Sequence, residues 1–147
     1  MINLREITTE DMLAECIFRI KVSEEQEKLC DTNVFSLAMA WYWPDTARPF
    51  CIYDDDVMVG FLMLECDESE NTCEIWNLMI DEKYQGKGYG KAAVKAVIEY
   101  FKANPVFENL YVTTLPENLV AIKMFESCGF YLTGEQYENE VVLQLAK

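Results

Sequence analysis

The amino-acid sequence predicts one mixed domain of the α/β (α+β) class. Strand-like and helix-like segments follow one another in the order β-α-α-β-β-β-α-β-α-β-β. The chain has 147 residues, about the size of one domain, and 51% of them are hydrophobic, enough for one sizeable core. It has no internal repeat, linker or low-complexity segment, so we expect residues 1–147 to form a single domain.

The first third of the chain predicts one strand and two helices. Residues 2–7 alternate between apolar and polar side chains, like a half-buried strand. A threonine pair can then cap a helix that runs to about residue 20. Residues 23–31 are polar and fit a loop or a short helix. Residues 34–43 predict a second helix, which the following proline ends.

The middle of the chain predicts three strands and a long helix. Residues 50–54 and 57–66 fit two antiparallel strands joined by a tight, Asp-rich turn. Residues 73–80 fit a third long strand. Residues 90–103 carry apolar side chains at helical spacing and end at an Asn-Pro pair.

The last third predicts a strand, a short helix and two final strands. Residues 110–115 fit the strand, and residues 118–128 fit the helix, with Gly129 as the residue that ends it. Residues 130–135 and 141–146 fit the last two strands.

The composition excludes several kinds of chemistry. The chain contains no histidine, which removes Ser-His-Asp and Cys-His nucleophilic catalysis and argues against an ordinary zinc site, so we expect no metal. The six cysteines form no CxxC pair and are expected to be reduced and partly buried. A general base must then be a carboxylate, a tyrosine, a lysine, a cysteine or a held water.

The net charge of −14 argues against a nucleic-acid partner, because phosphate backbones bind basic surfaces. The acidity either keeps the protein soluble or attracts a cationic substrate, and the sequence leaves both open. No apolar run reaches the roughly 18 residues that a membrane span needs. The N-terminus has acids where a signal peptide is apolar, so we expect a cytoplasmic protein without a membrane partner.

Residues 85–90, QGKGYG, hold three of the six glycines and lie between a predicted strand and a predicted helix. Backbone N–H groups at such a helix start are suited to phosphate, and Lys87 and Lys91 add positive charge. No GK[ST] follows, so the turn is not a Walker A loop, and its spacing does not fit the Rossmann GxGxxG turn. A tight turn without a ligand is the other interpretation.

The order Gln85-x-x-Gly88-x-Gly90 resembles the Q/R-x-x-G-x-G/A signature of the GNAT superfamily of N-acetyltransferases. Residues 118–130, NLVAIKMFESCGF, resemble the second segment of that family. The resemblance implies the GNAT-type fold, a mixed and mostly antiparallel central sheet flanked by helices. Segments that include VSEEQE (22–27), RPFCIY (48–53) and MIDEKYQGKGYG (79–90) are similar to bacterial spermine/spermidine (diamine) N-acetyltransferases.

The resemblance implies direct attack of a neutral amine on the thioester of acetyl-CoA. Acetyl-CoA would be the co-substrate, and a small cationic amine such as spermidine or spermine would accept the acetyl group. The alternatives are an acetyltransferase for a peptide N-terminus, an amino acid or an aminoglycoside, and a non-catalytic coenzyme A-binding module. Relatives often dimerise, so a homodimer is an expectation.

By resemblance, the cofactor would lie against a strand, the glycine turn and a later helix. Backbone N–H groups of the strand would bind the pantetheine arm and the acetyl oxygen, and the turn would cradle the pyrophosphate. Asn118 would hydrogen-bond the cofactor, or it only caps its own helix. The predicted cofactor-binding residues are Leu78, Met79, Ile80, Gln85, Gly86, Lys87, Gly88, Tyr89, Gly90, Lys91, Asn118 and Phe125.

Glu74 is the predicted general base, because it precedes Gln85 by the spacing that several superfamily members use. The alternative is an exposed carboxylate at the end of a strand, and Glu65 and Glu135 are lesser candidates for the base. Phe125 occupies the usual position of the general-acid tyrosine and cannot protonate the leaving thiolate. Either solvent protonates the thiolate, or Tyr131, Tyr89 or Cys128 donates the proton instead, or the protein is a slow or inactive enzyme.

The predicted substrate-binding residues follow from the charge that a polycation requires. Several carboxylates, with aromatic faces beside them, would bind its amino groups. The acidic run 24–31 and the aromatic run 41–43 supply both. The alternative interpretations are a solvated surface for the first run and a core position for the second. The predicted set is Glu24, Gln26, Glu27, Asn33 and Glu135.

Overall fold

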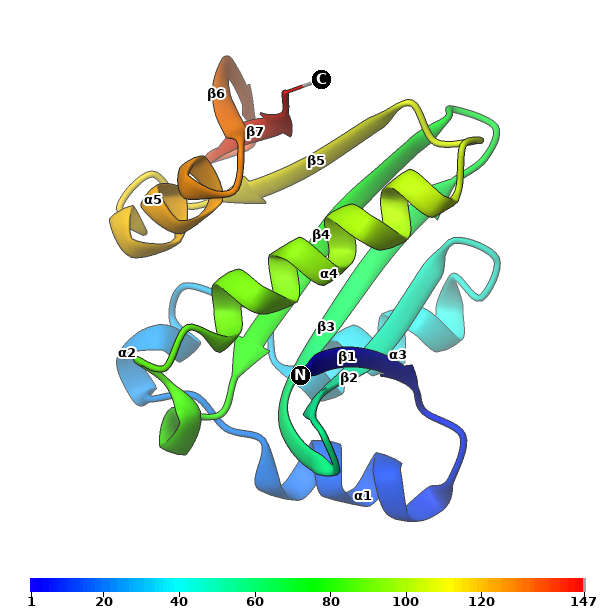
Figure 1. The fold of residues 1–147 in the computed structure, drawn as a ribbon. Helices are drawn as coiled ribbons and strands as arrows, with labels where there is room; N and C mark the ends of the chain where they lie inside the picture. The colour runs from blue at the N-terminus through cyan, green and yellow to red at the C-terminus, as the bar shows by residue number, and fades with distance from the viewer. Residues whose placement is uncertain (147) are drawn as a thin grey trace.

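The central sheet of the computed structural model has seven strands in the order β1-β2-β3-β4-β5-β7-β6 (Figure 1). The structure describes residues 1–146. Neighbouring strands are antiparallel except β4 and β5, which are parallel, so the predicted mixed and mostly antiparallel sheet is confirmed. The strands are β1 (Ile2–Glu6), β2 (Ala47–Asp54), β3 (Val57–Asp67), β4 (Thr72–Ile80), β5 (Asn109–Thr114), β6 (Phe130–Tyr137) and β7 (Glu140–Leu145).

The helices occur in the predicted order, and side chains cap the first three of them. Thr9, Ser23 and Thr32 accept hydrogen bonds from backbone N–H groups of the first turns of α1, α2 and α3. A short 3₁₀ helix, Glu82–Tyr84, was not predicted. The helices are α1 (Glu10–Arg19), α2 (Glu24–Glu27), α3 (Asn33–Tyr42), α4 (Tyr89–Ala103) and α5 (Leu119–Ser127).

Strand β2 begins three residues earlier than predicted. Its first residues, 47–49, pair with β3. They were not predicted as strand because Arg48 and Pro49 interrupt the strand-like sequence pattern. Proline is tolerated because β1 pairs only with Phe50–Asp54, so Pro49 lies beyond the end of β1.

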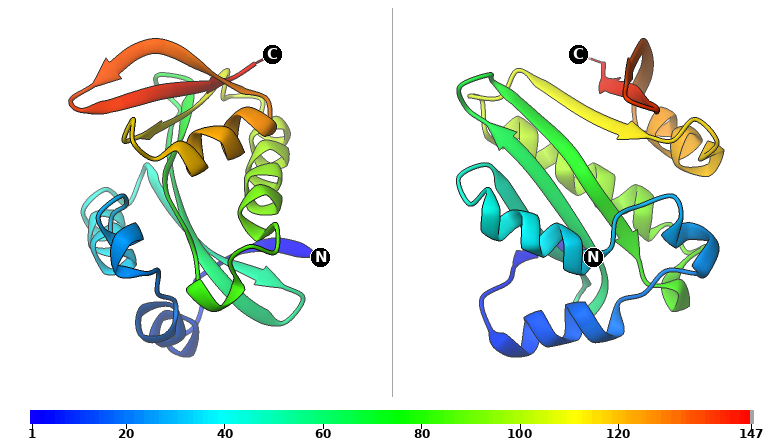
Figure 2. Two further views of the ribbon diagram at one scale, coloured as in Figure 1. Left: turned by 90° about the vertical axis from the view of Figure 1, so that its left-hand side faces the viewer. Right: turned by 180° about the vertical axis from the view of Figure 1, so that it is seen from behind.

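The helices cover the two faces of the sheet, with α1 and α3 on one face and α4 and α5 on the other (Figure 2). Alternate side chains of β2 enter different cores, as the period of a strand requires. Phe50 and Ile52 belong to the core under α4, whereas Cys51 and Tyr53 belong to the core under α1. The six cysteines are free thiols, as predicted.

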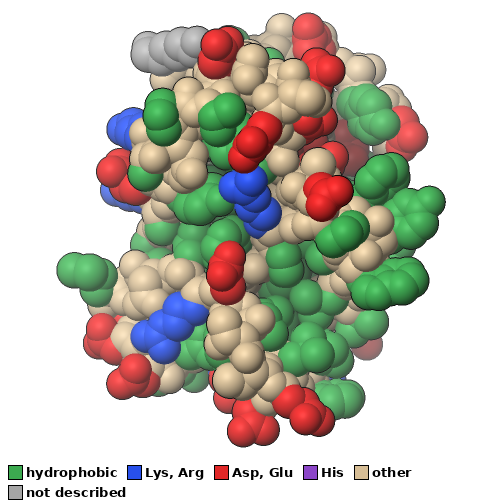
Figure 3. Space-filling model, turned by 90° about the vertical axis from the view of Figure 1, so that its right-hand side faces the viewer, with side chains coloured by type: hydrophobic (Ala, Val, Ile, Leu, Met, Phe, Trp, Pro, Cys, Tyr) green, Lys and Arg blue, Asp and Glu red, His purple; other side chains and the backbone are tan. Residues whose placement is uncertain are grey.

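Helix α3 has an unusual distribution of polar and apolar residues. Its buried side carries Asn33 and Ser36, and Ser36 accepts a hydrogen bond from Asn77 at 3.0 Å. Its outer side exposes Phe35 and Trp41, and Trp41 is 83% exposed. Figure 3, which faces this side of the molecule, shows hydrophobic side chains gathered at the surface. The outer face of α3 is therefore apolar.

Strands β4 and β5 diverge after a short paired region (Figure 1). Their pairing covers residues 72–75 of β4 and residues 109–112 of β5. Strand β4 continues to pair with β3 as far as Ile80, with a bulge at Trp76 that bends it. Among the described residues, the second half of β4 has no β5 partner, which leaves one edge of the strand open.

Candidate active site

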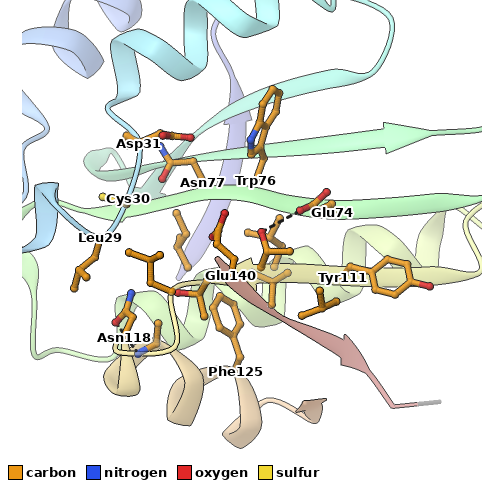
Figure 4. Close-up of a pocket in the computed structure, with 18 of the residues that line it drawn as sticks. Leu29, Cys30, Asp31, Glu74, Trp76, Asn77, Tyr111, Asn118, Phe125 and Glu140 are labelled. Atoms are coloured by element: carbon orange, nitrogen blue, oxygen red, sulfur yellow. Dashed lines mark hydrogen bonds between the residues drawn. The ribbon is translucent and has the colours of Figure 1, made fainter. Parts of the chain in front are cut away.

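A cavity of about 830 Å³ lies where β4 and β5 separate. Sites for small ligands commonly have roughly 300–1,000 Å³. Strands β3, β4, β5, β6 and β7, helix α5 and residues 28–31 after α2 contribute side chains to its lining (Figure 4). The cavity therefore draws on segments from both ends of the sequence.

A row of polar side chains crosses the sheet inside this cavity. Glu65 of β3 lies directly opposite Glu74 of β4, and Glu74 lies beside Tyr111 in the parallel register with β5. Thr113 follows Tyr111 by two residues and therefore points to the same face. The neighbours of Glu74 in sequence, such as Cys73, belong to the core under α4, so this row lies on the opposite face.

Strand β7 extends the row by one more carboxylate. Thr113 is paired with Val142, and Glu140 precedes Val142 by two residues on the same face. Figure 4 shows Glu74 and Glu140 at the cavity wall, on either side of the side chain to which Glu74 is hydrogen-bonded. We call Glu65, Glu74, Thr113 and Glu140 the polar row.

Within the polar row, Glu74 has the pKa that departs most from its ordinary value. Burial and, after it, the charge of Glu65 raise the pKa of Glu74 from 4.5 to about 7. The Thr113 hydroxyl donates to Oε1 of Glu74 at 3.4 Å and lowers that pKa in part, whereas Glu140 adds to the rise. Glu74 can therefore accept and release a proton near neutral pH, as a general base must.

The glycine turn opens toward solvent at the start of α4. Gly86 and Gly88 have φ of 75° and 83°, in the left-handed region that glycine favours. A Cβ atom at either position would meet no atom within 4 Å, so the space above both is open. No side chain caps α4, whose first N–H groups thus remain available for an anion such as a diphosphate.

Gln85 fixes this turn to two neighbouring elements. Its Nε2 atom donates to the carbonyl of Ile80 at 2.9 Å and to Oε1 of Gln26 at 2.7 Å. Gln26 of α2, predicted as a substrate residue, thus contacts the glycine turn. Gln85 positions the turn against the end of β4.

The hydrogen bond from Gln85 also shows which backbone groups of β4 face its open edge. It places the Ile80 carbonyl on the edge away from β3, and backbone groups of successive residues alternate between the two edges. Leu78 and Ile80 therefore direct their N–H groups to the open edge, and Met79 directs its N–H group to β3. Of the three predicted N–H donors, two have the orientation that a ligand at this edge requires.

Asn118 and Phe125 reach the cavity from the α5 side. Asn118 caps α5, since its Oδ1 atom accepts from the N–H of Ala121 at 3.3 Å, and it also lines the cavity. Phe125 is buried, packs edge-on against Phe130 with ring centres 5.5 Å apart, and lines the cavity as well. Its ring has no proton to donate.

The three side chains suggested as substitutes for a tyrosine at position 125 are absent from the cavity lining. Tyr89 donates to Asp54 at 2.6 Å, and Tyr131 is half exposed on β6. Tyr111 and Tyr137 line the cavity instead. Sequence reasoning missed both because their positions depend on how β5 and β6 join the sheet.

The predicted substrate residues are divided between the cavity and other places. Glu135 lines the cavity, whereas Glu24 and Glu27 lie on α2 outside it. Asn33 is buried and donates to the carbonyls of Cys16 at 2.6 Å and of Ile20 at 3.3 Å, so it joins α3 to the end of α1. Several lining residues had no predicted site role: Lys28, Cys30, Trp76, Asn77, Tyr111, Thr113, Tyr137 and Glu140.

Within residues 1–146, no group of three or more His, Cys, Asp or Glu side chains has an arrangement that could hold a metal ion. In the same part of the chain, every helix is too short or too polar to span a bilayer.

Comparison with known proteins identifies relatives over nearly the whole chain. A spermine/spermidine N(1)-acetyltransferase of Bacillus subtilis is 29% identical over 97% of this chain and 96% of its own. The solved structure of a Bacillus subtilis acetyltransferase in complex with CoA has a TM-score of 0.70 at 20% identity and covers 99% of this chain and 97% of that one. An aminoglycoside acetyltransferase in complex with coenzyme A has a TM-score of 0.76 at 17% identity, over 98% and 93% of the two chains.

The family assignment comes from the sequence pattern as a whole. Residues 12–130 match the Acetyltransferase (GNAT) family, a region that includes the glycine turn, Glu74 and the α5 segment. The mixed seven-stranded sheet agrees with the fold of the solved acetyltransferase structures. The chain therefore belongs to the GNAT family of acetyltransferases.

Proposed function

We propose that the protein transfers the acetyl group of acetyl-CoA to a primary amine of a small cationic substrate. The position of Glu74 is the main support, because it is a carboxylate with a pKa of about 7 in a cavity beside the open edge of β4. The glycine turn at the start of α4 supports the cofactor assignment. The coenzyme A in complex with the Bacillus subtilis structural relative points the same way.

The residues have distinct roles in this reaction. The substrate enters as an ammonium with a pKa near that of lysine, roughly 10.4, and must lose a proton before it attacks. Glu74 accepts that proton. The N–H groups of Leu78 and Ile80, at the open edge of β4, would bind the pantetheine arm and the acetyl oxygen, where negative charge develops. The glycine turn, with Lys87 and Lys91 nearby, holds the diphosphate of the cofactor.

We propose spermidine or spermine as the substrate. Among residues 1–146, the cavity lining has one basic side chain, Lys28, and an excess of carboxylates that suits an amine with several positive charges. The relative from Bacillus subtilis that bears the name spermine/spermidine N(1)-acetyltransferase supports the same choice. The lining carboxylates are Asp31, Glu65, Glu74, Glu135 and Glu140.

A panel of amines tests this assignment. Purified protein with acetyl-CoA is assayed for thiol release with spermidine, spermine, an aminoglycoside, a peptide with a free N-terminus and an amino acid. We expect the highest kcat/KM for spermidine or spermine. Higher values for another amine would reject the polyamine assignment, and release with none of them would reject the proposed transfer.

Glu74→Gln is the matched variant for the base. It keeps the size and a hydrogen-bonding group of the side chain but cannot take a proton, so kcat should fall by about 100-fold. An unchanged kcat would remove Glu74 as the base.

The remaining expectations concern the whole protein. We propose that residues 1–147 form one acetyltransferase domain, which the continuous sheet supports. A cytoplasmic location stays a prediction.

We also propose a homodimer, and the apolar outer face of α3 supports it. Two chains that each carry a charge of −14 approach most easily through a surface without charged side chains. Sedimentation of the wild type and of Trp41→Glu checks it: a wild-type monomer would contradict the proposal.

A further inference from the structure

The base in the cavity has a neighbour that can take a proton from it. The hydroxyl of Thr113 lies 3.4 Å from Oε1 of Glu74, and a threonine hydroxyl both donates and accepts hydrogen bonds. The register of β4 and β5 keeps both side chains on one face of the sheet. Thr113 thus lies next to Glu74 along the polar row.

On its other side, Thr113 faces Glu140. The β5–β7 register makes Glu140 the diagonal neighbour of Thr113 on the same face, and both line the cavity. Glu140 is only partly buried and begins β7 directly after an exposed two-residue turn, Glu138 and Asn139. Glu140 is therefore the member of the row that lies nearest to the exposed β6–β7 turn.

We propose that Thr113 and Glu140 form a relay that carries the substrate proton from Glu74 to solvent. This inference rests on the proposed function, in which Glu74 takes that proton. Protonated Glu74 donates to the Thr113 oxygen while the Thr113 hydroxyl donates its own proton to Glu140. Glu140 then releases a proton to water, so all three side chains return to their starting state and no bond to carbon changes.

The charges around the row raise the affinity for a proton at both ends of the relay, Glu74 and Glu140. The carboxylates of Glu65 on β3 and Glu140 on β7 lie near Glu74. Their negative charges oppose the ionisation of Glu74. Glu140 faces Asp31 from the segment after α2 and Glu138 from the turn. Burial, followed by these two charges, raises the pKa of Glu140, while the Thr113 hydroxyl lowers it in part. A carboxylate with a raised pKa is a better proton acceptor near neutral pH.

Three variants test the relay. Thr113→Val removes the hydroxyl at nearly constant volume, Thr113→Ser retains it, and Glu140→Gln cannot be protonated on its side chain. We expect kcat to fall about tenfold in Thr113→Val and in Glu140→Gln, with KM for the amine unchanged and with Thr113→Ser close to wild type. Imidazole in the buffer should restore part of the kcat of Glu140→Gln, because it can accept protons from the row in place of the missing carboxylate.

The possible results separate the relay from the proposed function. No acetylation by the wild type would contradict the proposed function itself, whereas an unchanged kcat in Glu74→Gln would remove Glu74 as the base and the relay with it. If Glu74→Gln is impaired but Thr113→Val and Glu140→Gln retain wild-type kcat, the relay is wrong and the base stands. A loss confined to Thr113→Val would make Thr113 a positioning residue for Glu74. A higher KM with unchanged kcat in Glu140→Gln would make Glu140 a substrate contact. Either of these last two results also overturns the relay.

Discussion

Glu74 combines a favourable position for proton transfer with an unfavourable one for stability. It lies directly opposite Glu65 across β3 and β4, and like charges in that arrangement repel. Burial adds to the cost of its ionised form. The same features that keep its proton exchangeable near pH 7 therefore destabilise the folded protein whenever Glu74 is charged.

The sign of this effect predicts a stabilising substitution. A carboxyl whose pKa rises from 4.5 to about 7 on folding contributes stability below pH 4.5 that is lost as pH rises to 7. Glu74→Gln should therefore increase the free energy of unfolding by about 2–3 kcal/mol at pH 8 and by less at pH 5.5. Urea unfolding at both pH values measures this, with Glu126→Gln on the exposed side of α5 as the control. An equal effect at both pH values would contradict the pKa of Glu74.

The activity of the wild type should follow the same group. Glu74 accepts a proton only when it is ionised, so kcat for the amine should rise with pH through about 7. A pH profile of kcat from pH 5.5 to 8.5 measures this. A kcat that is flat across that range would show that another group limits the reaction.

At the scale of elements, the turn before α4 joins a strand end to a helix start. Gln85 holds it against β4, and the two left-handed glycines keep side chains away from the N–H groups of the helix. A ligand phosphate can then approach the backbone directly. The turn is therefore a binding element whose shape depends on backbone conformation more than on side chains.

Substitution within this turn should weaken cofactor binding. Gly88→Ala introduces a Cβ into the open space and strains a φ of 83°, so the affinity for coenzyme A should fall about tenfold. Calorimetry with coenzyme A measures it. Gly134→Ala is the matched control, because Gly134 has a φ of 84° and open space but lies on β6, away from the turn. Equal losses in both variants would assign the effect to backbone strain alone.

The sequence predicted elements better than it predicted the site. Local periodicity and capping residues determine where α4 or β4 occurs, and the glycine spacing identified the turn. Thr113 and Glu140 carried no such signal, because the pairing of β4 with β5 brings Thr113 to Glu74 and the pairing of β5 with β7 brings Glu140 to Thr113. Asn33, expected at the substrate, instead satisfies carbonyls at the end of α1. Such roles depend on contacts between distant segments, which no local pattern records.

At the scale of the whole molecule, the charge of −14 should influence how a substrate arrives. Raising the ionic strength from about 0.01 to 0.15 M shortens the screening length from roughly 30 to 8 Å. The kcat/KM for spermidine should fall severalfold over that range, and the value for an amine with a single charge should fall less. Steady-state rates at both salt concentrations measure it. Equal salt dependence for the two amines would show that the acidic field does not select substrates by charge.

The short pairing of β4 with β5 divides the sheet into two blocks, one from β1 to β4 and the other from β5 to β7. Within the part of the chain that the structure describes, four residue pairs join the two blocks in the sheet, whereas β2 and β3 are paired along eight. Opening at this seam, between β4 and β5, breaks few backbone hydrogen bonds. The amide protons of residues 109–112 that point to β4 should therefore exchange with solvent sooner than those of β3. A ligand that contacts the free edge of β4 and also α5 would bridge the blocks, and its binding should slow exchange at the seam. The divergence that opens the cavity would thus also make it a hinge that the bound cofactor closes.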